Sequence, residues 1–357
     1  MTETRIGIVT TSRQGQPDTS ANILTEMVSH GDDSWRVQVH SIVRPDLPGE
    51  NSVTAACEVG IVALRALATA IRLRRRADIV VVNKTLSWDL VDAVFGVPLY
   101  ERLFLSHGGT VYATMDADYV PEPTKTRALF ENADLVLATS RAIYERATTV
   151  TSPDRVVLVS PSVDTDFFVP AVSESRADEN LVLGWVGGAD YHQENLRSLV
   201  TCLEAVEADG ITIRLLLGGG SLPDGVRNRL DEMGFDVDVI GYVPWEDVPE
   251  VINSIDVGLV PLQDTEFNRG KSSQKVREYM ACGVPVIASD VGENPHLIPE
   301  NAGVLVDGPD GWADAVALLS DDETRAEMGA HAREHVEEQY AVPVVAEQIK
   351  EAFDRIR

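Results

Sequence analysis

Lysine is scarce in this chain. Only five of its 357 residues are lysine, against 25 arginines and 57 acidic residues, and the formal net charge is -27. Such a surface repels nucleic acid and anionic lipid, and it repels itself at low salt. At about 1 M salt the Debye length falls to roughly 3 Å, which removes that self-repulsion. The simplest explanation is a cytoplasm of high ionic strength, as in a halophilic archaeon. An unusually acidic mesophilic protein is the alternative.

Cysteine and long apolar stretches are also rare. The three cysteines, Cys57, Cys202 and Cys282, are far apart and form no C-x-x-C pair, which argues against a disulfide framework or a zinc site. No uncharged apolar stretch approaches the roughly 20 residues of a membrane-spanning helix. Residues 1–5 lead directly into a short apolar segment without the pattern of a signal peptide. We therefore expect a cytoplasmic protein.

Two common phosphate-binding motifs are missing. GKSS, at residues 270–273, looks like the end of the P-loop of nucleoside triphosphatases, but Thr265 stands where that motif needs its first glycine. No G-x-G-x-x-G with a following acidic residue marks a dinucleotide site. A nucleotide that binds this chain must therefore be held in another way.

Short apolar runs alternate with amphipathic stretches along the chain, which is typical of parallel sheets with crossover helices. The pattern predicts an α/β fold with two doubly wound, Rossmann-like domains, and ligands of such sheets bind at the carboxyl ends of the strands. The predicted strands are 6–10, 37–42, 79–83, 110–115, 135–139, 156–160, 181–187, 211–219, 237–242, 256–262, 284–289 and 303–307.

A polar, proline-punctuated stretch near the middle of the chain predicts a linker between the two domains. We expect a first domain at 1–165, the linker at 166–180 and a second domain at 181–338. The last segment, 339–357, has a helical pattern.

The segment RGKSSQKVREYMACGVPVIASDVGEN, residues 269–294, is the most informative part of the sequence. On a helix, Lys271, Lys275 and Glu278 would share one polar stripe, because they are spaced i, i+4 and i+7. Ser272 and Ser273 suit the start of that helix, where free backbone N–H groups favour an anion. Two cations, a helix start and one carboxylate can hold a diphosphate at one end and a pair of hydroxyls at the other. We therefore expect a nucleotide-sugar ligand.

This segment resembles the donor-binding core of retaining glycosyltransferases of the GT-B fold, in particular glycosyltransferase family 4. The family's E-Y-M-A helix and G-x-P-V-I-A-S strand match residues 278–281 and 283–289. The resemblance extends more loosely over nearly the whole chain, and it implies two domains facing a cleft and a C-terminal helix that crosses back to the first domain. The first of two glutamates that the family often carries would fall at Gly270, so that carboxylate is missing or replaced.

The resemblance also implies roles for individual residues. Arg269 and Lys271, with the Ser272 and Ser273 amides, would stabilise charge on the leaving diphosphate. Lys275 would add to this or pair with Glu278, whose carboxylate would accept hydrogen bonds from the ribose hydroxyls. The further donor-side candidates, each of which could instead be a structural turn, are Gly187, Gly188, Gly218, Tyr242, Gly292, Glu293 and Asn294.

Candidates on the acceptor side lie in the first half of the chain. Asp116 follows a predicted strand in the region that faces the cleft in the resembled enzymes, where a carboxylate contacts the sugar or acceptor, and Asp118 is an acceptor-side candidate. Both aspartates could instead cap the next helix. Gly15 lies in the loop after the first strand, where the family has a glycine-rich turn.

A run of arginines stands out in so acidic a chain. It could dock on an anionic membrane that carries a lipid-linked acceptor, or it could be the solvated end of a helix. Its members are Arg65, Arg72, Arg74, Arg75 and Arg76.

The resemblance implies transfer of a sugar from a nucleotide-diphosphate-sugar to a glycan or lipid-linked acceptor, with retention of configuration and no obligatory metal. The sequence leaves two alternatives open. One is a nucleotide-sugar epimerase of the same fold. The other, prompted by the missing glutamate at Gly270, is a non-catalytic sugar-nucleotide-binding partner.

Overall fold

The computed structural model describes residues 3–13, 19–44, 64–65, 67–73, 75–84, 105, 108–171, 180–189, 192–208, 213–222 and 224–356. By its packing the chain divides into two compact units. Unit 1 comprises Met1–Ser162, Gly270–Ser272 and Val342–Arg357, and unit 2 comprises Val163–Arg269 and Ser273–Ala341. The predicted linker is not a separate body in this division, and its residues 172–179 lie outside the described residues.

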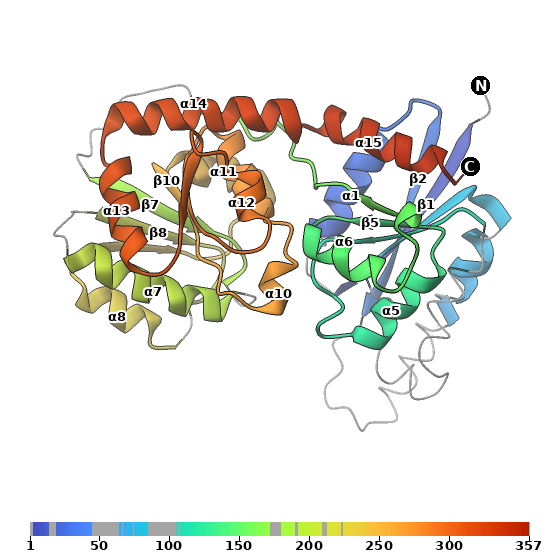
Figure 1. Ribbon diagram of the computed structural model, residues 1–357, viewed down its shortest axis with the longest axis horizontal. Coiled ribbons are helices and arrows are strands. Elements are labelled where there is room, and N and C mark those ends of the chain that lie inside the picture. The colour runs from blue at the N-terminus through green and yellow to red at the C-terminus, as the bar shows by residue number, and fades with distance from the viewer. Residues whose placement is uncertain are drawn as a thin grey trace. The chain divides into compact units, whose positions relative to one another are not determined.

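Unit 1 is built on a six-stranded parallel sheet with the order β2-β1-β3-β4-β5-β6 (Figure 1). Its labelled elements are β1 (Thr4–Arg13), α1 (Thr19–Ser29), β2 (Trp35–Arg44), β3 (Ile79–Asn83), β4 (Thr110–Thr114), α5 (Pro123–Asn132), β5 (Leu135–Ala138), α6 (Arg141–Thr148), η1 (Pro153–Arg155), β6 (Val156–Leu158) and α15 (Val342–Asp354). Residues 64–65, 67–73 and 75–76 are also helical.

The C-terminal helix completes the core of unit 1. One face of α15 is apolar, and Val345, Ile349 and Phe353 pack with residues of β1, β3 and α1 in one buried cluster. The Phe353 ring stacks on Trp35 at the start of β2, with 5.4 Å between ring centroids. Figure 1 shows α15, in red, beside α1. Residues from the two ends of the chain therefore share one core.

Unit 2 contains the second six-stranded parallel sheet, in the order β12-β11-β10-β7-β8-β9. Its elements are β7 (Leu181–Val186), α7 (Gln193–Ala208), β8 (Ile213–Gly218), α8 (Val226–Glu232), β9 (Asp236–Ile240), η3 (Trp245–Asp247), α9 (Val248–Asn253), β10 (Val257–Val260), α10 (Glu266–Arg269), α11 (Gln274–Ala281), β11 (Val286–Ser289), α12 (Asn294–Leu297), β12 (Gly303–Val306), α13 (Asp310–Leu319) and α14 (Asp322–Gln339).

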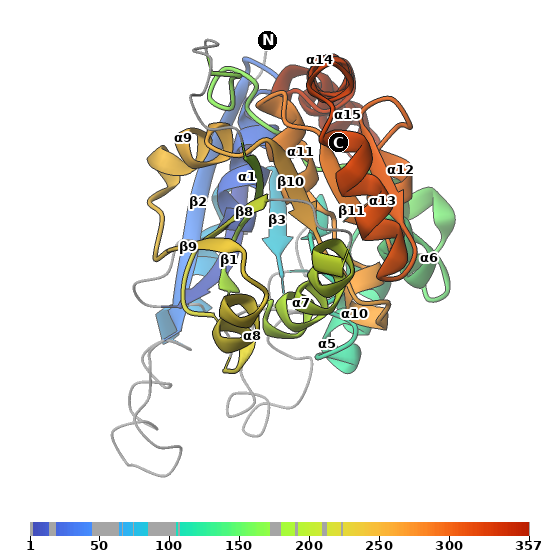
Figure 2. The ribbon, with the colours of Figure 1, turned by 90° about the vertical axis from the view of Figure 1, so that its left-hand side faces the viewer.

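Successive residues of the strands in unit 2 pack on opposite faces of the sheet, as strand geometry requires. Leu183 and Trp185 of β7 join the core under α7, α8 and α13, whereas Val182 and Val186 join the core under α9, α11 and α14. Figure 2 shows the unit from the side, with the sheet between its helices. Because both faces are covered, the central strands β7 and β10 are buried and apolar throughout, which explains their clear signal in the sequence, whereas the edge strand β9 carries Asp236 and Asp238.

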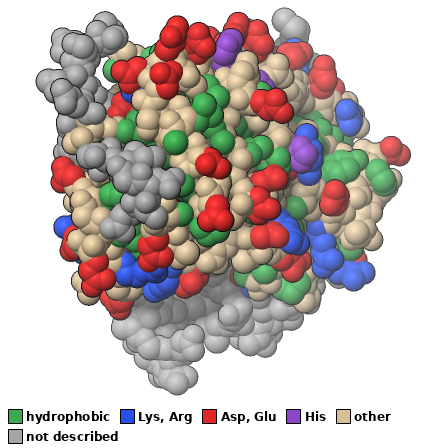
Figure 3. Space-filling model, turned by 60° about the vertical axis from the view of Figure 1, so that its left-hand side comes forward, with side chains coloured by type: hydrophobic (Ala, Val, Ile, Leu, Met, Phe, Trp, Pro, Cys, Tyr) green, Lys and Arg blue, Asp and Glu red, His purple; other side chains and the backbone are tan. Residues whose placement is uncertain are grey.

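The predicted fold is confirmed. Each predicted strand is present, with ends that differ by up to three residues, and all neighbouring strands run parallel. The strand order reverses between β1 and β3 in unit 1 and between β7 and β10 in unit 2, as in doubly wound sheets. The cleft between the domains stays a prediction. Acidic side chains are spread over the face of the molecule shown in Figure 3, in keeping with the net charge.

Candidate functional site

The strand order places the candidate nucleotide site of unit 2 at the carboxyl ends of β7 and β10. Ligands of open parallel sheets bind at the point where the strand order reverses, because the crossover helices diverge to opposite faces there. β7 ends at Val186 and is followed by Gly187, and β10 pairs with β7 on one side and with β11 on the other. Residues that follow these strands are therefore the first to consider.

Helix α11 is anchored at this point by Tyr279. The Tyr279 hydroxyl accepts a hydrogen bond from the Val186 backbone N–H at 2.8 Å. Its ring lies on Gly258 of β10, where a Cβ would come within 2.5 Å of the ring. Burial raises the pKa of Tyr279, so the hydroxyl stays protonated. The side chain thus fixes the helix to both strands of the reversal point.

Lys275 lies one turn before Tyr279 and reaches the turn after β7. A Cβ built on Gly187 would lie 2.1 Å from Lys275 Cε and 2.6 Å from Nζ, so a larger residue there would force the end of this side chain to move. The ammonium also lies 5.5 Å from the centroid of the Trp185 ring. The Gly187 amide already donates to the Gly218 carbonyl at 3.0 Å. Lys275, rather than that amide, therefore supplies positive character at the turn.

The glycine turns after β7 and after β8 are in close backbone contact. Gly219, after β8, has a φ of +103°, and a Cβ there would come within 1.9 Å of the Gly187 carbonyl oxygen. Ala189 N–H donates to the Gly219 carbonyl at 3.0 Å. Gly219 is thus required by close approach of backbone, whereas a Cβ on Gly187 would meet side chains only, chiefly Lys275. Gly188 follows Gly187 in the same turn.

The predicted helical stripe of Lys271, Lys275 and Glu278 is wrong in one member. Helix α11 begins at Gln274, because Ser273 has a left-handed backbone (φ 55°) that cannot continue a helix toward the N-terminus. Lys271 therefore precedes the helix and packs within unit 1, as does Ser272. The Ser273 side chain makes no capping hydrogen bond. Lys275 and Glu278 remain neighbours at i and i+3 on α11.

Glu278 is almost fully buried beside Lys275. Burial raises the pKa of the Glu278 carboxyl to about 7, while the nearby charges of Lys275 and Arg277 act in the opposite direction. Arg277 is fully buried, and burial lowers its pKa to about 10. Its guanidinium lies 5.0 Å from the centroid of the Tyr340 ring. At neutral pH Glu278 is therefore poised between its neutral and ionised forms.

The turn after β11 brings Gly292, Glu293 and Asn294 together. Gly292 has a φ of +64° and lies against the backbone of α10, where a Cβ would come within 3.0 Å of the Asn268 and Arg269 carbonyl oxygens. Glu293 and Asn294 are buried. The Asn294 amide donates to the Ser289 carbonyl at 2.9 Å, and its own side-chain oxygen is buried without a hydrogen-bond partner. That oxygen is therefore a buried acceptor that no described donor satisfies.

Arg269, predicted to stabilise the diphosphate, is held by a carboxylate. Its guanidinium forms a two-point ion pair with Asp264, with Nη2 and Oδ2 2.7 Å apart. Both side chains are more than half exposed. The predicted role therefore requires a phosphate to compete with Asp264.

A buried amide network near α10 was missed by the sequence reasoning. The Asn195 side-chain oxygen accepts from Gln263 N–H at 3.1 Å and from the Asn268 amide at 3.0 Å. The Asn268 amide also donates to the Gln263 carbonyl. The one sign of this network in the sequence is Asn195, a polar residue next to the apolar Leu196 at the start of α7. It fixes the segment after β10 against α7.

In unit 1, Asp116 and Lys271 come together, with 3.8 Å between Oδ1 and Nζ. The Ser140 hydroxyl donates to the Gly270 carbonyl at 3.0 Å. A Cβ on Gly270 would lie 2.5 Å from the Ala117 Cβ, so this packing leaves no room for a glutamate at that position. The departure from the family pattern at Gly270 thus has a steric reason in this chain.

Asp118 lies on the same turn as Asp116. Its Oδ2 accepts from the Thr114 hydroxyl at 2.9 Å. Burial first, and then the charge of the Asp116 carboxylate, raise the pKa of Asp118 to about 6, while Thr114 and Lys84 act in the opposite direction. Lys84 was not singled out in the sequence. It has a left-handed backbone (φ 63°) at the end of β3, beside the reversal point of this sheet.

The other candidates are less clearly placed in a site. Gly218 is the last residue of β8, and the Tyr242 side chain is largely exposed after β9. Gly15 and Arg74 lie outside the described residues.

Within the described part of the chain, no cluster of His, Cys, Asp and Glu could hold a metal ion. No helix in that part is long and apolar enough to cross a membrane.

Comparison with known proteins gives matches in sequence. Residues 180–322 match the family model described as "Glycosyl transferases group 1". A D-inositol 3-phosphate glycosyltransferase of Corynebacterium glutamicum (strain R) is 32% identical over 205 residues, which are 51% of this chain and 48% of that protein. A GDP-mannose-dependent monoacylated alpha-(1-6)-phosphatidylinositol monomannoside mannosyltransferase of the same species is 26% identical over 203 residues, 52% of this chain and 53% of that protein. The chain thus spans about half the length of these relatives.

Solved structures extend the likeness to the fold. A sucrose-phosphate synthase from Thermosynechococcus elongatus has a TM-score of 0.73 at 18% identity and covers 99% of both chains. Anabaena Alr3699/HepE in complex with UDP-glucose has a TM-score of 0.70 at 15% identity, covering 98% of this chain and 99% of that one. At such identities the likeness concerns the fold alone. In the sequence of 180–322 and in its α/β fold, the chain is therefore similar to the group 1 glycosyl transferases with the GT-B architecture.

Proposed function

We propose that this protein transfers a sugar from a nucleotide-diphosphate-sugar bound to unit 2, with retention of the anomeric configuration. One observation carries the proposal. At the reversal point of the second sheet, Lys275 lies against Gly187 and is followed one turn later by the buried carboxyl of Glu278. A cation and a carboxylate in this arrangement suit a diphosphate and a ribose.

The chemistry assigned to unit 2 is electrostatic. Negative charge grows on the diphosphate as its bond to the sugar breaks, and a fixed ammonium at that position lowers the barrier. Lys275 supplies this charge in the proposal, joined by Arg269 of the same unit where a phosphate displaces Asp264. The proposed reaction has no obligatory metal, because these side chains take the role of a counter-ion.

The acceptor is proposed to bind on unit 1 and to carry a phosphate. The names of two relatives support this, since one concerns D-inositol 3-phosphate and the other a phosphatidylinositol monomannoside. Asp116 and Asp118 would bind acceptor hydroxyls, because the partly buried carboxyl of Asp118 can accept or donate a hydrogen bond near neutral pH.

The proposal includes a peripheral contact with anionic membranes through the helical residues 64–65, 67–73 and 75–76. Leu64, Leu67 and Ile71 are exposed and lie on one face at i, i+3 and i+7. The exposed arginines of this segment are Arg65, Arg72, Arg75 and Arg76. An apolar face flanked by arginines is typical of a helix that lies in the membrane interface.

The membrane contact predicts that Ile71→Ser weakens sedimentation with vesicles containing anionic lipid by roughly tenfold, because one apolar side chain no longer enters the interface. The matched control is Val239→Ser, which replaces an exposed apolar residue of β9 in unit 2. Equal vesicle binding by the two variants, or no binding by the unaltered protein, would contradict the contact.

The proposed activity is tested by a screen of nucleotide-sugars for protection against thermal unfolding in molar KCl, followed by transfer to a phosphorylated polyol. A ligand at 100 times its Kd raises stability by about 2.7 kcal/mol, so a true donor gives a clear increase in Tm. Interconversion of the free donor would instead identify an epimerase. Protection without any reaction would identify a non-catalytic binding partner, and no protection by any nucleotide-sugar would refute the donor site.

A further inference from the structure

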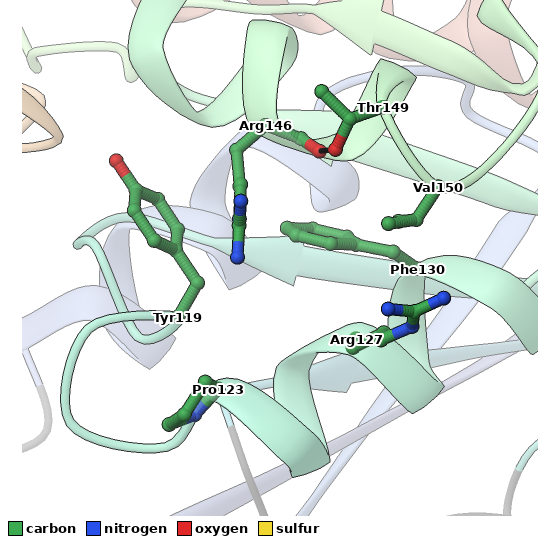
Figure 4. A pocket seen from close by; sticks show the side chains of 7 residues that line it. All are labelled: Tyr119, Pro123, Arg127, Phe130, Arg146, Thr149 and Val150. Atoms are coloured by element: carbon green, nitrogen blue, oxygen red, sulfur yellow. Dashed lines mark hydrogen bonds between the residues drawn. The ribbon is translucent and has the colours of Figure 1, made fainter.

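Unit 1 contains a cavity of about 220 Å³ between α5 and α6 that none of the roles above uses. Its wall combines apolar side chains, including Phe130 and Val150, with the guanidinium groups of Arg127 and Arg146. Figure 4 shows Arg146 between the rings of Tyr119 and Phe130, with Arg127 below Phe130. The cavity thus presents cationic donors next to flat carbon surfaces.

The Arg146 guanidinium is held by a ring rather than by a carboxylate. It lies 5.7 Å from the centroid of the Tyr119 ring, a cation–π contact. Among the described residues it forms no ion pair, in a chain where acidic residues outnumber basic ones nearly two to one. Its N–H groups make no hydrogen bond among the described residues, and a guanidinium can offer two of them to two oxygens of a phosphate.

Arg127 adds a second set of donors. Its Nε donates to Glu131 at 2.8 Å, and its terminal nitrogens make no hydrogen bond among the described residues. The local charge also differs from the rest of the chain, since residues 119–160 contain five basic and five acidic residues while the whole chain has a net charge of -27. An anion is therefore repelled far less at this cavity than elsewhere on the surface.

We infer that this cavity binds a phosphate ester, with the phosphate on Arg146 and Arg127 and the attached carbon skeleton on the apolar wall. The cavity begins at Tyr119, the residue after Asp118, so the bound ester lies next to the turn that carries the acceptor-side carboxylates. The inference deepens the proposed function, because it assigns a site to the phosphate of the proposed acceptor. The ester could be a soluble phosphorylated polyol or the headgroup of a phospholipid.

The test is a titration of the full chain with inorganic phosphate and with glycerol 3-phosphate at constant ionic strength, followed by ³¹P NMR. Arg146→Gln is expected to raise the Kd for inorganic phosphate and glycerol 3-phosphate at this cavity at least tenfold. Arg146→Lys is expected to restore the affinity only in part, because an ammonium cannot make the two-point contact. The matched control is Arg227→Gln, which removes an exposed arginine that pairs with Asp231 at i+4, as Arg127 pairs with Glu131.

A second arm measures sedimentation with vesicles of phosphatidylglycerol. Loss of vesicle binding on Arg146→Gln, with soluble esters unaffected, identifies a lipid headgroup as the source of the phosphate. If Arg146→Gln behaves like Arg227→Gln with both soluble esters and vesicles, the cavity is not a phosphate site. Phosphate that binds at the proposed donor site of unit 2 does so equally in every variant. It therefore does not affect the comparison between the variants. Because no turnover is measured, the result is independent of whether sugar transfer is observed.

Discussion

Lys275→Ala is expected to weaken binding of the nucleoside diphosphate and of the donor by roughly tenfold to a hundredfold, the range for loss of a hydrogen bond to a charged group. It is also expected to lower kcat, because charge on the diphosphate grows while the sugar bond breaks. The reason lies in the contact of its side chain with Gly187, which leaves the ammonium at the reversal point of the second sheet. Affinity is measured by calorimetry and kcat by release of the nucleoside diphosphate.

Lys350→Ala is the matched control for Lys275. This lysine lies on α15 and is balanced by Asp32 and Glu347 at 3.8 and 3.7 Å, away from any proposed ligand. Its loss changes the net charge by the same amount and is expected to leave affinity and kcat unchanged. If the two variants bind the diphosphate equally well, Lys275 is a structural residue of the turn and the donor site is placed wrongly.

The second large effect concerns Glu278 and pH. Its carboxyl has a pKa of about 7 because of burial, and the ionised form accepts the stronger hydrogen bonds from ribose hydroxyls. The ionised fraction rises about tenfold between pH 6 and 8 for such a pKa, so donor affinity is expected to rise by up to about that factor. Calorimetry with an intact nucleotide-sugar measures this, since its diphosphate does not change charge in that range.

Glu278→Gln is expected to bind the donor roughly ten- to a hundredfold more weakly and to lose the pH dependence. The effect of pH on folding stability has the opposite sign. The pKa is raised from 4.5 to about 7 in the native state, so stability falls as pH rises through that interval, and the variant is expected to have the higher Tm at pH 8. A variant with the same affinity and pH profile as the unaltered protein would remove Glu278 from the donor site.

The strands could be predicted because their signal is local. Strands such as β3 (Ile79–Asn83) and β11 (Val286–Ser289) are mostly buried on both faces, so each one is a nearly continuous apolar run. The βα alternation and the resemblance also predict that each sheet is doubly wound, and the strand orders agree with this. The close spacing of Lys275, Glu278 and Tyr279 also predicts correctly that these three residues share one helix.

The remainder depends on contacts between residues far apart in the sequence. Nothing local predicts that Ser273 adopts a left-handed backbone and separates Lys271 from the helix. The pairing of Arg269 with Asp264 and the packing of Gly270 against Ala117 likewise follow from neighbours that periodicity does not identify. The periodicity predicts a helix that includes Lys271. The left-handed backbone of Ser273 instead starts the helix at Gln274.

The central claim is that unit 2 binds the diphosphate of its ligand at Lys275 and the ribose at Glu278. A crystal structure of the full chain with the nucleoside diphosphate selected by the thermal screen tests this most directly. We predict phosphate oxygens within hydrogen-bond distance of Lys275 Nζ and ribose hydroxyls on the Glu278 carboxylate, at the ends of β7 and β10. A nucleotide bound elsewhere, with Lys275 still packed on Gly187 and no phosphate beside it, would contradict the account.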